Sequence, residues 1–146
     1  MKAVDLAHFL HEQIPATAAL ALQVLECSPE RVSLLAPFAF NYNHKNTVFG
    51  GSMALLATTC GWSFAHINCP ESGGNIVIQS GEIRYLKPAL GDLTAVCTAQ
   101  SPAQWQAVAD GVRERGKGRI DLVCELFSEG VLVAEFQGRY VVFAAI

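Results

Sequence analysis

The sequence predicts an α+β domain in which an antiparallel β-sheet wraps around one long buried helix, and three observations lead to this fold class. The segment 50–66 reads GGSMALLATTCGWSFAH, and its apolar residues occupy nearly every direction around a helix, which is typical of a helix inside a domain. The segment 118–128 alternates apolar and polar residues with the period of a strand that buries one face. The chain has 146 residues, a usual size for one domain. We therefore expect a single domain over residues 1–146.

The composition indicates a globular protein with a large interior. The residues are 51% hydrophobic and 16% charged, with a net charge of −3, which disfavours a disordered chain or a protein that coats nucleic acid. The five cysteines form no Cys-x-x-Cys pair and no histidine cluster has ligand spacing, so neither a disulfide framework nor a metal site is expected. The first residues lack the apolar stretch of a signal peptide, and no segment approaches the roughly 20 apolar residues that span a bilayer. We expect a cytoplasmic protein without a membrane span.

Ahead of the central helix, the sequence predicts one helix and two strands. Apolar residues recur at helical spacing before Pro15, which indicates a short amphipathic helix that lies on the surface as a lid or strap. These residues are Val4, Leu6 or Ala7, Leu10 and Ile14. Residues 19–27 and 31–36 are rich in Leu, Val and Ala and are separated by a Ser-Pro-Glu turn, so both are predicted strands. Residues 38–47 show no clear periodicity and are predicted to form a loop.

After the central helix, the pattern predicts four long strands. Pro70 and the glycines that follow it end the helix, because proline cannot continue it. The predicted strands cover residues 75–87, 92–101, 118–128 and 131–144. A turn at 88–91 separates the first strand from the second, and a turn at 128–130 separates the third from the fourth. A longer excursion that contains Trp105 lies between the second and the third. Since the chain has no internal repeat or linker, one sheet around one helix accounts for all of it.

Several segments resemble the hotdog-fold acyl-thioesterases. The run NHKNTVFGG at 43–51 resembles the entry to the central helix of that fold, and GEIRYLKPA at 81–89, with Gly91-Asp92, resembles the strand and turn after the helix. The resemblance resumes within 119–144, so that it spans roughly residues 19–144 in the expected order. The Phe-Gly-Gly-Ser variant is most similar to the thioesterase domain attached to YiiD-type bacterial acetyltransferases. No acetyltransferase sequence is present in these residues.

This resemblance implies a hotdog fold and a homo-oligomer, at least a dimer, whose site is completed by a neighbouring subunit. It further implies hydrolysis of an acyl-CoA or acyl-carrier-protein thioester. No cofactor is expected, because coenzyme A is part of the substrate.

Gly50, Gly51 and Ser52 are the predicted oxyanion site. A thioesterase must stabilise the negative charge that develops on the carbonyl oxygen as water attacks, and free N–H groups at a helix N-terminus are suited to this task. Glycines also allow close approach of the acyl carbon. The alternative is that the glycines only allow the helix to pack closely on a strand, and the resemblance favours the catalytic interpretation.

The residues just before the helix are candidates for positioning the substrate. Asn43 matches the Asn that positions substrate or water in the family, and its amide can both donate and accept; a loop-capping role is the alternative. His44, beside it, can titrate near neutral pH. Phe49 stands where many relatives have His, so it can pack on the acyl chain or pantetheine but cannot donate a hydrogen bond. The substrate carbonyl would then be polarised by backbone N–H groups alone.

Thr58 stands at the helical position where relatives often carry Asp or Glu, with Thr59 beside it. A hydroxyl is not a strong general base, but either one could orient water. The alternative is that each bonds its own helix backbone. Weaker candidates for the missing acid–base group are the residues Glu82, Asp92 and His66, while Cys60 reads as a small core residue.

Basic residues could bind the phosphates of coenzyme A. We expect Arg84, Lys87 and Lys117 to contribute, the last within a basic cluster around Gly116-Lys117-Gly118. The alternative for this cluster is a solvated loop between strands.

The sequence thus predicts a thioester hydrolase. The second hypothesis is a hotdog module that binds acyl-CoA or dimerises a partner enzyme without hydrolysis, which the absence of a helix carboxylate motivates. A hydratase of the same fold is a third, weaker hypothesis, because no acid–base pair can be assigned.

Overall fold

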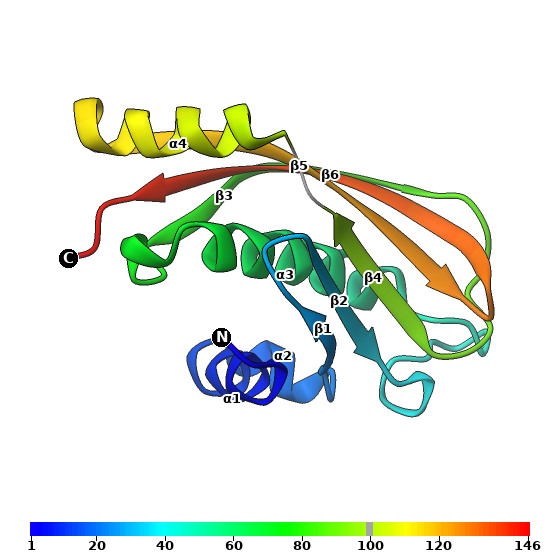
Figure 1. Ribbon diagram of the computed structural model, residues 1–146. Coiled ribbons are helices and arrows are strands. Elements are labelled where there is room, and N and C mark those ends of the chain that lie inside the picture. Colours follow the sequence, from blue (N-terminus) through cyan, green and yellow to red (C-terminus); the bar gives the residue numbers. More distant parts are fainter. Residues whose placement is uncertain (99–100) are drawn as a thin grey trace.

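A computed structural model describes residues 1–98 and 101–146 of the chain and shows a six-stranded antiparallel sheet curved around one long helix, α3 (Figure 1). The strands lie in the order β1-β2-β4-β5-β6-β3. Their bounds are Gln23–Cys27 for β1, Arg31–Ala36 for β2, Ile76–Tyr85 for β3, Leu93–Thr98 for β4, Lys117–Ser128 for β5 and Val131–Phe143 for β6. The predicted α+β architecture is confirmed.

The central helix α3, Gly50–Asn68, extends two residues beyond the predicted end at 66. Its buried residues lie on several sides, as expected for a helix enclosed by a sheet. The inner face of β5 supplies much of the opposing surface, because its residues alternate strictly between buried and exposed up to Leu126. Ile120, Leu122, Cys124 and Leu126 are buried, as the period-two pattern predicted.

The N-terminal elements differ in part from the prediction. Helix α1, Ala3–Gln13, buries Leu6 and Leu10 but leaves Val4 70% exposed, so Val4 is not part of the packed stripe. Strand β1 begins later than residue 19, because Pro15–Ala19 forms the short helix α2 with proline in its first turn. Two 3-10 turns, η1 (Phe38–Phe40) and η2 (Pro70–Ser72), flank α3 in the chain.

The largest correction concerns the excursion around Trp105, which is a fourth helix. Helix α4, Pro102–Arg115, has proline in its first turn and ends at Gly116 in the left-handed conformation. Trp105, Val108 and Val112 pack on the core at helical spacing. The predicted strand 92–101 ends at Thr98 in β4, and its positions 99–100 lie outside the described residues.

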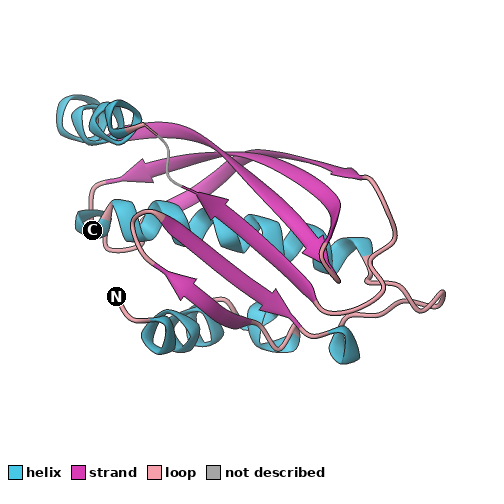
Figure 2. Ribbon diagram, turned by 45° about the vertical axis from the view of Figure 1, so that its right-hand side comes forward, coloured by secondary structure: helices cyan, strands magenta, loops and turns pink. Residues whose placement is uncertain are grey.

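The two edge strands of the sheet have different neighbours. Helix α1 packs against the edge strand β1, whereas β3, at the other edge, pairs only with β6 among the strands of the described chain. In Figure 2 the long strands cross α3 on one side while α1 lies beside β1.

Within the described residues no helix is both long and apolar enough to cross a lipid bilayer. All five cysteines are free thiols.

Candidate active site at the entrance of α3

Three backbone amides are free at the start of α3. The chain enters the helix through Phe49, whose extended backbone (φ −60°, ψ 132°) carries no side-chain cap. The Phe49 N–H donates to the Asn41 carbonyl (2.7 Å), and the first helical bond runs from the Met53 N–H to the Phe49 carbonyl (3.1 Å). The N–H groups of residues 50–52 therefore have no acceptor within the part of the chain that is described. Together with the positive end of the helix dipole, such free donors can stabilise negative charge.

A groove of about 360 Å³ lies beside these amides. Its floor is apolar, because Val48, Met53 and Ala89 are buried there. Lys45 and Lys87 are exposed side chains that line it from opposite walls. The combination of an apolar floor, cationic walls and free amides can hold an extended ligand with an anionic group.

The two walls of the groove are joined by backbone hydrogen bonds. The Val48 N–H donates to the Ala89 carbonyl (2.9 Å), which ties the loop before α3 to the segment after β3. The N–H groups of Leu86 and Lys87 both donate to the Val133 carbonyl (2.8 and 3.2 Å), which ties that segment to β6. The position of Lys87 is thus fixed through its backbone.

Tyr85 completes the entrance and was not singled out from the sequence. Its hydroxyl donates to the Gly50 carbonyl (3.0 Å). A Cβ on Gly50 would lie 3.4 Å from the Tyr85 ring, so the glycine allows the ring to lie close to the helix start. Since Ile83 faces the interior, the alternation of β3 would have placed Tyr85 on the same inner face.

The Phe49 ring lies against the other glycine of the pair. A Cβ built on Gly51 would overlap this ring, although Phe49 itself is 56% exposed. Close packing and free amides therefore occur together at the two glycines, so the two interpretations drawn from the sequence do not exclude each other.

Asn43 orders the loop that carries Lys45. Its Oδ1 accepts hydrogen bonds from the Lys45 N–H (2.9 Å), the Thr47 N–H (3.2 Å) and the Thr47 hydroxyl (3.2 Å). This is the loop-capping role that the sequence left open. The Nδ2 group has no acceptor among residues 1–98 and 101–146, so the side chain retains two donors for a ligand.

The two threonines have different partners. The buried Thr59 donates its hydroxyl to the Leu55 carbonyl (2.8 Å), which is the backbone role of a helical threonine. Thr58 is half-buried, and its hydroxyl has no hydrogen-bond partner in the described chain, while its carbonyl accepts from the Tyr140 hydroxyl (2.8 Å). Of the two, only Thr58 has a hydroxyl available to a water molecule.

The structure does not bring all of the expected residues to the groove. Arg84 lies on the face of β3 opposite to Tyr85, so the sheet separates it from α3. Lys117 opens β5 and pairs with Phe143, near the C-terminal end of α3 rather than its entrance. His44 is exposed in the loop and does not line the groove.

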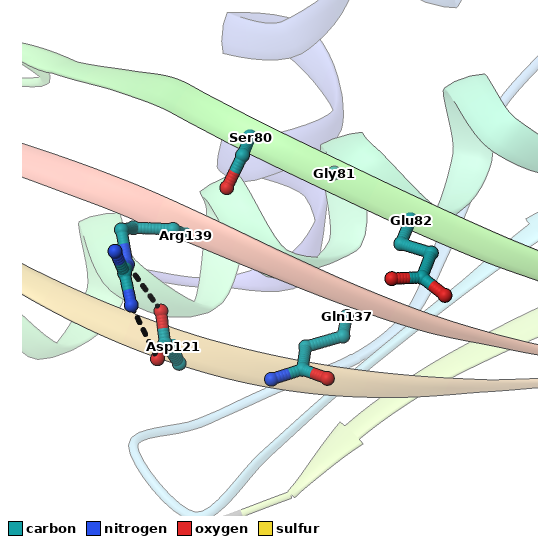
Figure 3. A pocket seen from close by; sticks show the side chains of 6 residues that line it. All are labelled: Ser80, Gly81, Glu82, Asp121, Gln137 and Arg139. Atoms are coloured by element: carbon teal, nitrogen blue, oxygen red, sulfur yellow. Dashed lines mark hydrogen bonds and ion pairs between the residues drawn. The ribbon is translucent and has the colours of Figure 1, made fainter.

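The weaker carboxylate candidates are also remote. Asp92 accepts the Phe38 N–H through Oδ1 (2.8 Å) and so fixes a turn. Glu82 lines a second hollow of about 320 Å³, which lies on the outer face of the sheet and is drawn in Figure 3. There Asp121 accepts two hydrogen bonds from Arg139 (2.8 and 3.2 Å), which lowers the pKa of the Asp121 carboxyl. This hollow is polar and has no access to the amides of α3.

Cys60 is buried in the core, whereas His66 is half-buried in the last turns of α3. The His66 ring stacks on Phe9 and Trp62 at centroid distances of 5.3 and 5.1 Å, and burial lowers its pKa. The buried Cys60 thiol contacts the carbonyls of Val32 and Ala95. Neither side chain lines the groove.

Comparisons with known proteins agree with this geometry. A family model described as "Putative thioesterase (yiiD_Cterm)" matches residues 3–144. A thioesterase-like protein of Shewanella oneidensis is 27% identical, with 97% of this chain and 96% of that chain covered and a TM-score of 0.84. A protein of unknown function from Chlorobaculum tepidum is 24% identical, with 97% and 94% covered and a TM-score of 0.90. A probable thioesterase of Pseudomonas aeruginosa is 22% identical, with 99% and 97% covered and a TM-score of 0.84. The shared fold is the hotdog fold.

Proposed function

Because this chain belongs to the yiiD C-terminal thioesterase family, we propose that it hydrolyses an acyl thioester at the entrance of α3. The observation that carries this proposal is the set of unpaired amides of Gly50, Gly51 and Ser52 beside a groove with an apolar floor. The family resemblance expected from the sequence is confirmed; the reaction and its substrate are proposals.

In the proposed reaction, water attacks the thioester carbonyl carbon. The new C–O bond forms as the carbonyl oxygen becomes an oxyanion, and the free amides of α3 stabilise this charge. The C–S bond then breaks, and the proton released by water passes to the departing thiolate, so the products are a carboxylic acid and a thiol. The hydroxyl of Thr58 orients the water, and the Asn43 Nδ2 donors help to hold the substrate.

The groove supports a substrate with an acyl thioester on a phosphorylated arm. Coenzyme A and acyl carrier protein both present phosphopantetheine, whose phosphate can pair with Lys45 and Lys87. The apolar floor would hold the uncharged part of the arm. The five free thiols fit a reducing compartment, and we place the reaction in the cytoplasm on that basis.

We propose that a second copy of the chain completes the site. Gly51 and Thr58 are seven residues apart on one helix, which separates them by about 10 Å, whereas an attacking water lies within about 3.5 Å of the carbonyl carbon. This separation favours a site in which the amides of one subunit face Thr58 of another. The unpaired edge of β3, with Val77 52% exposed, offers a surface for such a contact.

One observation favours a second candidate function, a module that binds acyl-CoA without hydrolysing it. No Asp or Glu lines the groove in the described part of the chain, so a strong general base is not provided there by this subunit.

Free-thiol release from short, medium and long acyl-CoAs and from acyl carrier protein tests the two functions, with Asn43→Ala and Thr58→Val as variants. Turnover that falls in both variants supports the hydrolase. Binding of acyl-CoA without turnover at any chain length would reject the hydrolase and support the binding module. Wild-type turnover that both variants retain would reject the assignment of the site.

A further inference from the structure

The hydroxyl of Tyr140 contacts two backbone groups of α3 that lie one turn apart. Tyr140 lies on the inner face of β6 and is fully buried. Its hydroxyl donates to the Thr58 carbonyl (2.8 Å) and accepts a hydrogen bond from the Trp62 N–H. In a regular α-helix the N–H of residue 62 donates directly to the carbonyl of residue 58. A side chain from the sheet therefore contacts both backbone groups of this helical step.

Gly61 provides the space for this contact. A Cβ on Gly61 would overlap the Tyr140 hydroxyl and lie 2.7 Å from the ring carbon Cζ. Glycine inside a helix normally costs about 0.5–1 kcal/mol relative to alanine. Here the missing side chain lets an aromatic ring reach the helix backbone.

A second side chain contacts the preceding step of the ladder. The Cys124 thiol, on the neighbouring strand β5, contacts the Ala57 carbonyl (Sγ to O, 3.6 Å) and the Gly61 N–H. Two successive steps of α3, from 57 to 61 and from 58 to 62, thus meet side chains of the sheet.

This turn carries Thr58, whose hydroxyl has no partner in the described chain, while the hydroxyl of the next residue, Thr59, bonds the helix backbone. The direction of the Cα–Cβ bond of Thr58 depends on the local backbone, which the Tyr140 hydroxyl holds through the Thr58 carbonyl. Burial raises the pKa of Tyr140, so the hydroxyl remains protonated and continues to donate.

We propose that Tyr140 is a positioning residue that directs the Thr58 hydroxyl into the active site by holding the Thr58 carbonyl in this turn of α3. This inference rests on the proposed function, in which Thr58 orients the attacking water. Tyr140 does not touch the substrate; it acts through the Thr58 backbone.

A double-mutant cycle measures this coupling through Tyr140→Phe, Thr58→Val and the combined variant. Tyr140→Phe keeps the ring and removes the hydroxyl, so we expect kcat to fall about tenfold with KM unchanged, since small displacements of a reacting group cost one to two orders of magnitude in rate. The combined variant should be no slower than Thr58→Val alone. Independent, multiplicative losses would overturn the proposal.

The matched control is Cys60→Ala, which removes a buried thiol from the same helix; the thiol's partners are the carbonyls of Val32 and Ala95 and the Cys124 side chain. It should lower stability and leave kcat unchanged. A kcat loss in Cys60→Ala equal to that in Tyr140→Phe would show a general effect of destabilisation and overturn the proposal.

A second measurement separates this inference from the proposed function. The methyl resonance of Thr58, observed by NMR, should shift in Tyr140→Phe and stay in place in Cys60→Ala. If wild-type protein releases no thiol from any substrate, the proposed function fails, and the resonance alone decides whether Tyr140 positions Thr58. An unmoved resonance in Tyr140→Phe overturns the positioning role whatever the activity.

Discussion

The ring of Phe49 occupies the space beside Gly51 where any other residue would carry its Cβ. Phe49 precedes the helix and Gly51 is in its first turn, so the ring folds back over the start of α3. The exposed ring can move, because 56% of Phe49 is accessible to solvent. The ring therefore lies beside the first amides of α3.

Gly51→Ala should leave the protein folded and reduce hydrolysis. The added methyl group displaces the Phe49 ring, and alanine is favoured over glycine in a helix by up to about 1 kcal/mol, so the midpoint of urea unfolding should change little. We expect kcat/KM to fall at least about tenfold, because the methyl group enters the approach to the free amides. Stopped thiol-release assays and urea titrations measure the two effects. Full activity in Gly51→Ala would place the reacting carbonyl elsewhere.

Gly61→Ala should give the opposite result, a loss of stability. Its Cβ meets the ring of Tyr140, which is fully buried and cannot rotate away. Overpacking of this kind costs about 1–3 kcal/mol. Urea unfolding monitored by tryptophan fluorescence measures it. An unchanged unfolding free energy would mean that the Tyr140 ring does not pack against Gly61.

Lys45→Ala and Lys87→Ala should weaken substrate binding. Each removes one cation from the groove, so KM for acyl-CoA should rise about three- to tenfold at low salt, with a smaller effect at high salt, where screening is stronger. The control Lys2→Ala removes the same charge from the start of α1. Lys117→Ala, at the far end of α3, should also leave KM unchanged. A larger effect of Lys117→Ala than of Lys87→Ala would move the phosphate site away from the groove.

Val77→Glu should dissociate the proposed dimer, and Val123→Glu should not. The two valines are similarly exposed, at 52% and 50%, but Val77 lies on the open edge strand β3 while Val123 lies within the sheet on β5. Light scattering coupled to size-exclusion chromatography gives the mass of each variant. Hydrolysis should be lost with the dimer, because the proposed site needs two subunits. An active monomer would contradict the shared site.

The stability of the protein should decrease as pH falls below the ordinary pKa of histidine. Burial lowers the pKa of His66 from 6.5, and the N-terminal ammonium lowers it further. Between the lowered value and 6.5 the unfolded chain binds more protons than the folded chain, so the free energy of unfolding rises with pH in that window and is level above it. Urea titrations between pH 5 and 8 give the slope. His66→Phe retains an aromatic ring against Phe9 and Trp62 and should flatten the curve; an unchanged slope would assign it to other groups.

The sequence was informative where one local pattern decided the structure. Helix α3 has apolar residues all round and β5 has strict alternation, so the buried helix and the sheet around it could be predicted. The helix α4 was missed because only three of its side chains, Trp105, Val108 and Val112, face the core among many polar residues. Its proline start and glycine end were visible signals.

The candidate site could be predicted only in part. The amides of α3 follow from the two glycines and the helix start, but the roles of single side chains depend on directions that a linear pattern does not give. Arg84 and Tyr85 are adjacent and point to opposite faces of β3. The contact between Tyr140 and Thr58 joins residues 82 positions apart, and it could be found only when the sheet and the helix were seen together.

The loop that the Asn43 side chain closes is ordered before a substrate binds. Its side-chain oxygen holds the backbone of Lys45 and Thr47 from within the same loop, and the bond from Val48 to Ala89 anchors the end of the loop to the opposite wall. The cationic side chain is therefore carried on a preorganised backbone before any ligand arrives. Since little conformational freedom remains to be lost there, association should need no ordering of this wall, and its rate should be set by diffusion and charge.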